Sequence, residues 1–153
     1  MNDWATTERV RAEIIIAEGL TVAGEVHLQA RVAHREGPET PLEMLNRDDA
    51  WIPLTLDDGG ITFVAKAQIA VVTCESGFLP EDRARAEVVR RIELEVMLVG
   101  GAEYRGWAAA ELPPTRMRAL DYLNGIGKFF SLRSNGSTHF IHQRHVRFVR
   151  PLD

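Results

Sequence analysis

LEMLNR (Leu42–Arg47) and LDYLNG (Leu120–Gly125) are two versions of one short stretch, 78 positions apart in a chain of 153 residues. Both keep an asparagine at the same place, and each is followed by an apolar run that an aromatic residue leads, AWIPLTL in the first case and KFFSL in the second. Repetition of this kind at a fixed distance is typical of a duplicated structural unit.

Two further pairs of segments support a duplication. GLTVAGEV (Gly19–Val26) aligns with GAEYRGWA (Gly101–Ala108) at an offset of 82, with both glycines matched. GGITFVAKAQIAVV (Gly59–Val72) aligns with GSTHFIHQRHVRFV (Gly136–Val149) at an offset of 77. The blocks follow one another in the same order, and the differences in length fall in polar stretches. The sequence therefore predicts a tandem repeat.

The composition is that of an ordinary globular protein, with 45% hydrophobic and 26% charged residues. No apolar run approaches the ~20 residues that a membrane-spanning helix needs, and the first residues, MNDWATTERVRAE, carry charges where a secretory signal has an apolar core. The single cysteine, Cys74, excludes an intrachain disulfide and fits a reducing compartment. We expect a cytoplasmic protein.

Apolar residues alternate with polar ones in both copies, the period of a β-strand. RVRAEIII places Ile14 and Ile16 on one face, and RIELEVML does the same with Val96 and Leu98. Asp/Asn-Gly turns in LDDGGI and RSNGST join the next apolar runs. The predicted strands are Arg9–Ile16, Thr21–Val32, Trp51–Leu56, Ile61–Lys66 and Ile69–Cys74, then Arg91–Leu98, Glu103–Glu111, Phe129–Arg133, Thr138–Gln143 and Val146–Arg150.

This pattern predicts a mainly β fold of two tandem five-stranded small barrels, residues 1–75 and 88–153, with a short helix or loop before the third strand of each. The two copies are joined by a linker, 76–87, in which the sequence Pro-Glu-Asp could start a short helix. A single barrel with interleaved strands remains the rival. The expected core is Ile14, Ile16, Val26, Leu45, Ile52, Leu54, Phe63 and Ile69, with Val96, Leu98, Leu123, Phe130, Leu132, Phe140 and Val146.

A family resemblance emerges from these residues. GAEYRGWA followed by LDYLN resembles the first signature of Sm-like proteins, and FIHQRHVRFV is similar to the second. Two features depart from the family pattern: at least ten residues separate the second strand from the Asp-x-x-Asn group, and the glycine after the basic residue is replaced by Ala67 and His145. The matching positions are Gly106, Asp121, Asn124 and Arg144 in the second copy, and Gly24, Glu43, Asn46 and Lys66 in the first.

The resemblance implies a bent five-stranded barrel that pairs edge to edge into rings, often around RNA. In that family the Asp, Asn and basic side chains hold a base and its phosphate. The implied ligand residues are therefore Asp121, Asn124, Arg144, Glu43, Asn46 and Lys66. An asparagine before a turn also commonly binds backbone groups, and we expect this structural role for Asn46 and Asn124.

The two parts of the chain differ in charge. Residues 1–100 carry 10 Lys+Arg against 18 Asp+Glu, a balance of −8, whereas residues 101–153 carry 8 against 4, a balance of +4. An acidic chain is a poor general ligand for nucleic acid. The second copy is the better candidate, because Arg133, Arg147 and Arg150 form a candidate basic surface beside Arg144. Alternatively, the acidic half of one molecule meets the basic half of another.

The sequence offers no recognisable catalytic centre. Cys74 ends an apolar strand, where a lone cysteine is usually a small buried residue. His139, His142 and His145 are three residues apart, a spacing that points strand residues to opposite faces, so only a turn between them could bring two together. We expect no enzyme activity, cofactor or metal. We favour a non-catalytic assembly or adaptor protein that binds a protein partner and forms a homo-oligomer, a dimer or a trimer. The alternative is an Sm-like RNA or nucleotide binder that uses the basic second copy.

Overall fold

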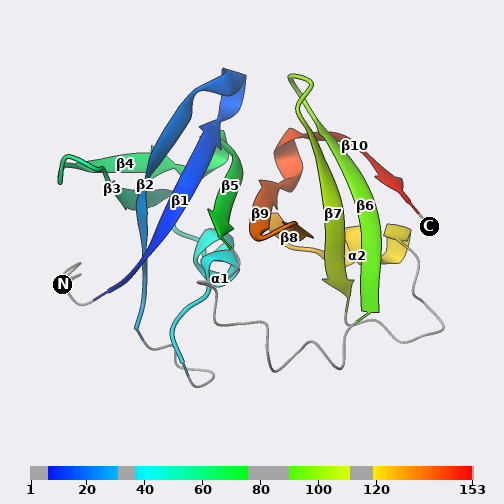
Figure 1. The fold of residues 1–153 in the computed structure, drawn as a ribbon, viewed down its shortest axis with the longest axis horizontal. Helices are drawn as coiled ribbons and strands as arrows, with labels where there is room; N and C mark the ends of the chain where they lie inside the picture. The colour runs from blue at the N-terminus through cyan, green and yellow to red at the C-terminus, as the bar shows by residue number, and fades with distance from the viewer. Residues whose placement is uncertain (1–6, 31–36, 76–89, 111–118, 153) are drawn as a thin grey trace.

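The computed structural model describes residues 7–30, 37–75, 90–110 and 119–152. Within these residues the regular structure consists of two short α-helices, ten β-strands and short 3-10 turns (Figure 1). The first half contains β1 (Glu8–Ile16), β2 (Thr21–Leu28), α1 (Pro41–Asn46), β3 (Trp51–Thr55), β4 (Ile61–Ala65) and β5 (Ile69–Glu75). The second contains β6 (Arg90–Leu98), β7 (Glu103–Ala110), α2 (Ala119–Gly125), β8 (Phe129–Ser134), β9 (Ser137–His142) and β10 (Val146–Pro151).

The mainly β prediction is confirmed, but the ten strands form one antiparallel sheet rather than two separate five-stranded barrels. Their order is β10-β6-β7-β8-β9-β5-β1-β2-β3-β4. The sheet is continuous because β5 pairs with β9, which joins the halves in the middle (Figure 1). Each half contributes five adjacent strands, so the strands are not interleaved. The predicted linker, 76–87, lies outside the described residues.

The halves repeat one internal arrangement. In each, the first strand lies between the second and the fifth, and the second is followed by the third and fourth. A 3-10 turn precedes the last strand in both cases, η3 (Lys66–Gln68) before β5 and η7 (Gln143–His145) before β10. The short helix expected before the third strand is present in both halves, as α1 and α2.

Local sequence explains the strands and their turns. Along β1 the side chains of Ala12 and Ile14 are buried, while Glu13 between them is exposed, as strand alternation requires. The β3–β4 and β8–β9 turns place Gly59 at a φ of 88° and Gly136 at 75°. Only glycine adopts this backbone conformation readily, which is why the Asp/Asn-Gly pairs mark these turns.

Two glycines allow neighbouring strands to come unusually close. A Cβ atom added to Gly24 in β2 would lie 2.4 Å from the backbone oxygen of Thr55 in β3. In the second half, a Cβ on Gly106 in β7 would lie 2.0 Å from the backbone oxygen of Arg133 in β8. The matched glycines of the two sequence copies therefore do the same structural task.

Most of the predicted core is buried, but the prediction for Phe63 is wrong. Phe63 is 59% exposed, whereas its counterpart Phe140 is fully buried. The difference arises because Phe140 lies on β9, which β5 covers, while Phe63 lies on β4, the last strand of the sheet. Three further predicted core residues, Ile16, Leu123 and Val146, are half-buried.

Candidate functional site

Asn46 joins the two halves through a pair of hydrogen bonds. It ends α1, and its side-chain Nδ2 donates to the backbone oxygen of Phe129 at 3.2 Å. The Phe129 backbone N–H donates to Asn46 Oδ1 at 2.8 Å. The amide thus satisfies both backbone groups of the first residue of β8, 83 residues away. The predicted structural role is confirmed for Asn46.

The helix that carries Asn46 is fixed at its start by a capping box. The Glu43 backbone N–H donates to Thr40 Oγ1 at 3.1 Å, and the Thr40 N–H donates to Glu43 Oε1 at 2.9 Å. These bonds satisfy backbone donors that a helix leaves free at its N-terminus. Glu43, predicted as a ligand residue, has this role in the structure. The sequence signal for this role is Thr-Pro-Leu-Glu before an apolar residue.

Lys66 holds the other end of the same helix. Its buried side chain donates from Nζ to the backbone oxygens of Met44, at 2.8 Å, and Arg47, at 3.1 Å. A cation at these carbonyls also complements the negative end of the helix dipole. Burial lowers the pKa of Lys66, an effect opposed by the nearby carboxylates of Asp49 and Glu39. Lys66 is therefore engaged with backbone in the structure, rather than directed at solvent.

The equivalent residues of the second half are arranged differently. Asp121 is half-buried in the first turn of α2, and Asn124 is exposed near its end. Within the described part of the chain, no hydrogen bond of the Asn124 side chain is present. The backbone bond predicted for Asn124 is thus not found there, because the strand start that Asn46 binds has no counterpart beside α2.

Lys66 and Arg144, which the Sm-like resemblance matches to one another, do not take equivalent positions in the structure. Gln143 takes the first position of η7, as Lys66 does in η3. Its backbone N–H donates to Lys128 O at 2.8 Å, as the N–H of Lys66 donates to Ala50 O at 2.9 Å. The Gln143 side chain donates to Gly127 O at 2.6 Å. Arg144 follows as an exposed residue, so the six predicted ligand residues do not converge on one site.

The contact between β5 and β9, which we call the junction, also uses all three closely spaced histidines. His142 Nδ1 donates to Ile69 O at 3.1 Å, and His145 Nε2 donates to Ala67 O at 3.0 Å. His139 Nδ1 lies 2.8 Å from Thr73 Oγ1. Burial lowers the pKa of His142, and the positive groups of His145, Arg144 and Lys128 lower it further, while the bond to Ile69 opposes the shift. Burial also lowers the pKa of His139.

Aromatic residues of the second half complete the core of the first. Phe129 and Phe140 are 1% and 0% exposed and pack among first-half residues such as Ile14 and Leu45. In return, Val71 of β5 packs into the core of the second half. The junction is therefore an apolar contact in both directions, with β5 paired to β9.

The ends of the sheet expose the residues that correspond to these buried ones. Among the described strands, β4 and β10 each pair on one side only. At the offsets of the repeat, Trp51 corresponds to Phe129 and is 60% exposed, and Phe63 corresponds to Phe140. At the opposite end, Phe148 on β10 corresponds to the buried Val71 and is 43% exposed. We call these surfaces the β4 end and the β10 end.

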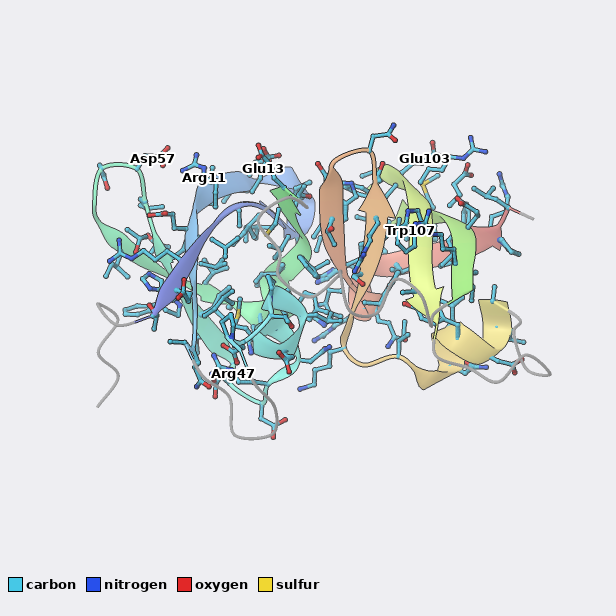
Figure 2. The ribbon with its side chains drawn as sticks, turned by 60° about the horizontal axis from the view of Figure 1, so that its bottom comes forward. Arg11, Glu13, Arg47, Asp57, Glu103 and Trp107 are labelled. Carbon is cyan, nitrogen blue, oxygen red and sulfur yellow. The ribbon has the colours of Figure 1, made fainter. Side chains whose placement is uncertain are left out.

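The candidate basic surface is distributed over different parts of the second half. Arg133 stands over the ring of Trp107 on β7, 5.0 Å from its centroid, and Arg91 stands over the same ring at 4.1 Å. Figure 2 shows Trp107 within the second half, well apart from Arg47 of the first. Arg147 is exposed on β10, where Arg150 pairs with Glu95 at 3.1 Å.

On the first half, an exposed ion pair links β1 to the β3–β4 turn. Arg11 and Asp57 form this pair through two hydrogen bonds, and their side chains point toward one another in Figure 2. The hydrogen bond from Arg11 lowers the pKa of Asp57, and the same contact raises that of Arg11. Exposed pairs of this kind contribute little to stability, so we assign the pair no functional role.

Two other kinds of site are not found in the described residues. No group of three or more His, Cys, Asp or Glu side chains there is placed to hold a metal ion. No helix in the same residues is long and apolar enough to cross a membrane. The lone cysteine, Cys74, is buried in the core of the first half.

Comparison of the chain with protein-family models, with curated proteins and with solved structures gave no match.

Proposed function

We propose that this chain is a non-catalytic assembly protein, built from two copies of a bent five-stranded small barrel, that binds a protein partner through the open edges of its sheet. The observation that carries the proposal is the exposure of large apolar side chains on the two end strands of the sheet and on β3 beside β4. Four of them, Trp51, Ile61, Phe63 and Phe148, lie on β3, β4 and β10. Contiguous exposed apolar residues mark interaction surfaces in soluble domains.

The repeated arrangement supports the two-barrel part of the proposal. Both halves have the same strand order, the same position of the helix and the same close approach at Gly24 and Gly106. Each half also has its own apolar cluster. A glycine at which two strands nearly touch permits the sharp bend with which a short sheet wraps round a core.

The open edges support the binding part. A terminal strand presents unpaired N–H and C=O groups, and proteins usually blunt such a strand with charge or cover it. The outward residues of β4 are instead Ile61, Thr62 and Phe63, all exposed and uncharged. A partner strand that pairs with β4 would satisfy the backbone groups and cover the apolar side chains together.

In the first half, the polar residues that the Sm-like resemblance matches to ligand positions support a non-catalytic role. Glu43, Asn46 and Lys66 are each bonded to backbone groups that hold α1 and β8 in place. Groups held in this way stabilise the fold and have little freedom to take up a substrate.

The test is whether association with a partner depends on the edges. A tagged chain would be isolated with its bound proteins from cells that carry the gene naturally, as wild type and as the variants Phe63→Asp, Phe148→Asp and Leu20→Asp. Leu20 is the matched control, because it is 64% exposed but lies in the β1–β2 turn. We expect Leu20→Asp to retain the bound protein and at least one edge variant to lose it. Equal recovery with all variants would refute edge binding.

A second candidate, binding of RNA or a nucleotide by the basic second half, is favoured by the Arg91–Trp107–Arg133 stack. Aromatic rings and guanidinium planes are the groups on which single-stranded bases stack. Asp121, Asn124 and Arg144 are the further residues that the Sm-like resemblance adds. A gel-shift titration with short RNAs over a salt series separates the two functions. RNA binding that weakens with salt and is lost in Trp107→Ala would favour this candidate.

A further inference from the structure

The junction shows what kind of surface the exposed ends are suited to meet. Within the chain, β5 pairs with β9 in a defined register, with Val71 opposite Ile141, Val72 opposite Phe140 and Thr73 opposite His139. At the repeat offset of 77, β5 corresponds to β10 and β9 corresponds to β4. The two strands that form the junction thus have their counterparts at the two open ends of the same sheet.

The buried residues of the junction have apolar counterparts at the ends. Phe129 and Phe140 correspond to the exposed Trp51 and Phe63 at the β4 end, and Val71 corresponds to the exposed Phe148 at the β10 end. An apolar residue is therefore retained at each of these positions, where Trp51 is 60%, Phe63 59% and Phe148 43% exposed. Burying large aromatic side chains of this kind is a main source of binding energy at protein interfaces.

The pair of hydrogen bonds that Asn46 makes also involves residues with counterparts at the ends of the sheet. Asn46 binds the backbone N–H and C=O of Phe129, the residue that opens β8. The corresponding residues are Asn124, exposed on α2, and Trp51, which opens β3. In a single chain these two belong to opposite ends of the sheet. They meet only if the β10 end of one molecule contacts the β4 end of another.

The charges at the two ends of the sheet favour contact between a β4 end and a β10 end over contact between two identical ends. The loops on either side of β3 expose Asp48 and Asp58, together with Asp49 and Asp57, which pair with Arg47 and Arg11. The β10 end exposes Arg144 and Arg147, together with Arg150, which pairs with Glu95. Bringing the β10 end against a β4 end places opposite charges together, whereas pairing two β4 ends or two β10 ends places like charges together.

We propose that the partner is a second copy of this chain, bound head to tail, with β10 of one molecule pairing antiparallel to β4 of the next in the register of the junction. This inference rests on the proposed function. Phe148 then lies opposite Val64, Val149 opposite Phe63 and Arg150 opposite Thr62, and the Asn124 amide of one molecule binds the Trp51 backbone of the next. Pro151 has no N–H, so the ladder ends at Arg150.

Two variants of the purified chain test this arrangement by native mass spectrometry and sedimentation. Phe63→Asp alters only the β4 end, and Phe148→Asp alters only the β10 end; both side chains are exposed, so the fold should persist. We expect the wild type and the control Leu20→Asp to associate, and each end variant alone to associate about 30-fold more weakly or worse. Mixing the two variants should give one-to-one dimers, because the Phe63→Asp chain keeps an intact β10 end and the Phe148→Asp chain keeps an intact β4 end.

A cysteine pair tests the register. Thr62 and Arg150 correspond to His139 and Thr73, whose side chains are in contact at 2.8 Å. A chain with both Thr62→Cys and Arg150→Cys should form intermolecular disulfides on mild oxidation, and a chain with either change alone should not.

The outcomes separate this inference from the proposed function. A purified wild-type chain that stays monomeric at micromolar concentration overturns the second-copy assignment, while edge-dependent recovery of another protein from cells still supports the proposed function. A Phe148→Asp chain that dimerises as well as wild type shows a symmetric β4-to-β4 contact and overturns the head-to-tail arrangement alone. Self-association that neither end variant weakens overturns the arrangement and counts against edge binding itself.

Discussion

At the scale of single residues, Asn46 shows why a side chain with ligand chemistry can be committed to structure. An amide has one acceptor and two donors, which matches the C=O and N–H of one extended residue. Asn46 uses this match on Phe129, whose backbone faces α1 at the start of β8. Asn124 has the same sequence context, but its side chain is exposed and forms no hydrogen bond within the described residues. The same residue type is thus bound to backbone in one half and exposed in the other.

This difference predicts unequal effects on stability. In Asn46→Ala the Phe129 backbone loses both partners, so we expect the free energy of unfolding to fall by about 1–3 kcal/mol. Asn124→Ala should change it by less than about 0.5 kcal/mol. Urea unfolding followed by circular dichroism would measure both, at a protein concentration low enough to keep the chain monomeric. A loss in Asn124→Ala as large as that in Asn46→Ala would contradict the assignment.

At the scale of elements, the second and third strands of each half come very close to one another at one glycine. Gly106 in β7 leaves room for the backbone of Arg133 in β8, and Gly24 does the same for Thr55. Any side chain at these positions would force the strands apart, because backbone atoms cannot move aside as a flexible side chain can. The close approach of the two strands therefore requires the absence of a Cβ atom at one position in each half.

A single added methyl group at Gly106 should accordingly be costly. We expect Gly106→Ala to destabilise the protein by roughly 1–3 kcal/mol, the usual range for overpacking. Gly125→Ala is the matched control, since a Cβ there meets no atom within 4 Å, and it should have little effect. Thermal or urea unfolding of both variants would test this, and a Gly106→Ala protein as stable as the control would show that β7 and β8 can separate freely.

The strands and hairpins could be predicted from the sequence, but which residues a neighbouring strand buries could not. Alternation such as that around Ile14 and Asp/Asn-Gly turns such as that at Gly59 are local signals, so strands and hairpins could be predicted. The exposure of Phe63 could not, because alternation tells which face a residue occupies and not whether another strand lies beside it. For the same reason the β5–β9 pairing, which unites the sheet, depends on contacts between residues far apart in the chain.

At the scale of the whole molecule, the two halves are held together by a junction that contains titratable groups. His142 stacks on Phe129 with ring centroids 4.4 Å apart and also bonds to Ile69 of the other half. Its depressed pKa means that the unfolded chain takes up a proton on this ring more readily than the folded chain does. His139 contributes in the same direction. The contribution of these neutral rings to the free energy of unfolding is therefore fully present above pH 6.5, their ordinary pKa. It is lost as the pH falls toward their lowered pKa values.

We therefore predict that the protein becomes less stable between about pH 7 and about pH 5, a range above the ordinary pKa values of carboxylates. His142→Gln retains an N–H donor for Ile69 but does not titrate, so its stability should fall less over this range. Urea midpoints measured across the range for both proteins would test the prediction. Parallel curves for wild type and His142→Gln would show that the junction does not sense protonation of His142.

Repetition of the junction between molecules also constrains the size of the assembly. A head-to-tail contact uses different surfaces on the two partners, so each added molecule leaves one β4 end and one β10 end open until the chain of molecules meets itself. Closure covers the last pair of apolar ends without fixing another free molecule, so a ring is favoured over its open precursors.

We predict that native mass spectra at increasing protein concentration show monomer and one larger species of fixed size. Three molecules, with six five-strand units, is the size that the Sm-like resemblance implies. The Thr62→Cys, Arg150→Cys chain should then run on a denaturing gel without reductant as a single covalent species of that size. A ladder of species that lengthens with concentration would instead show that the contact turns too little or too much to close, and that the molecules form open filaments.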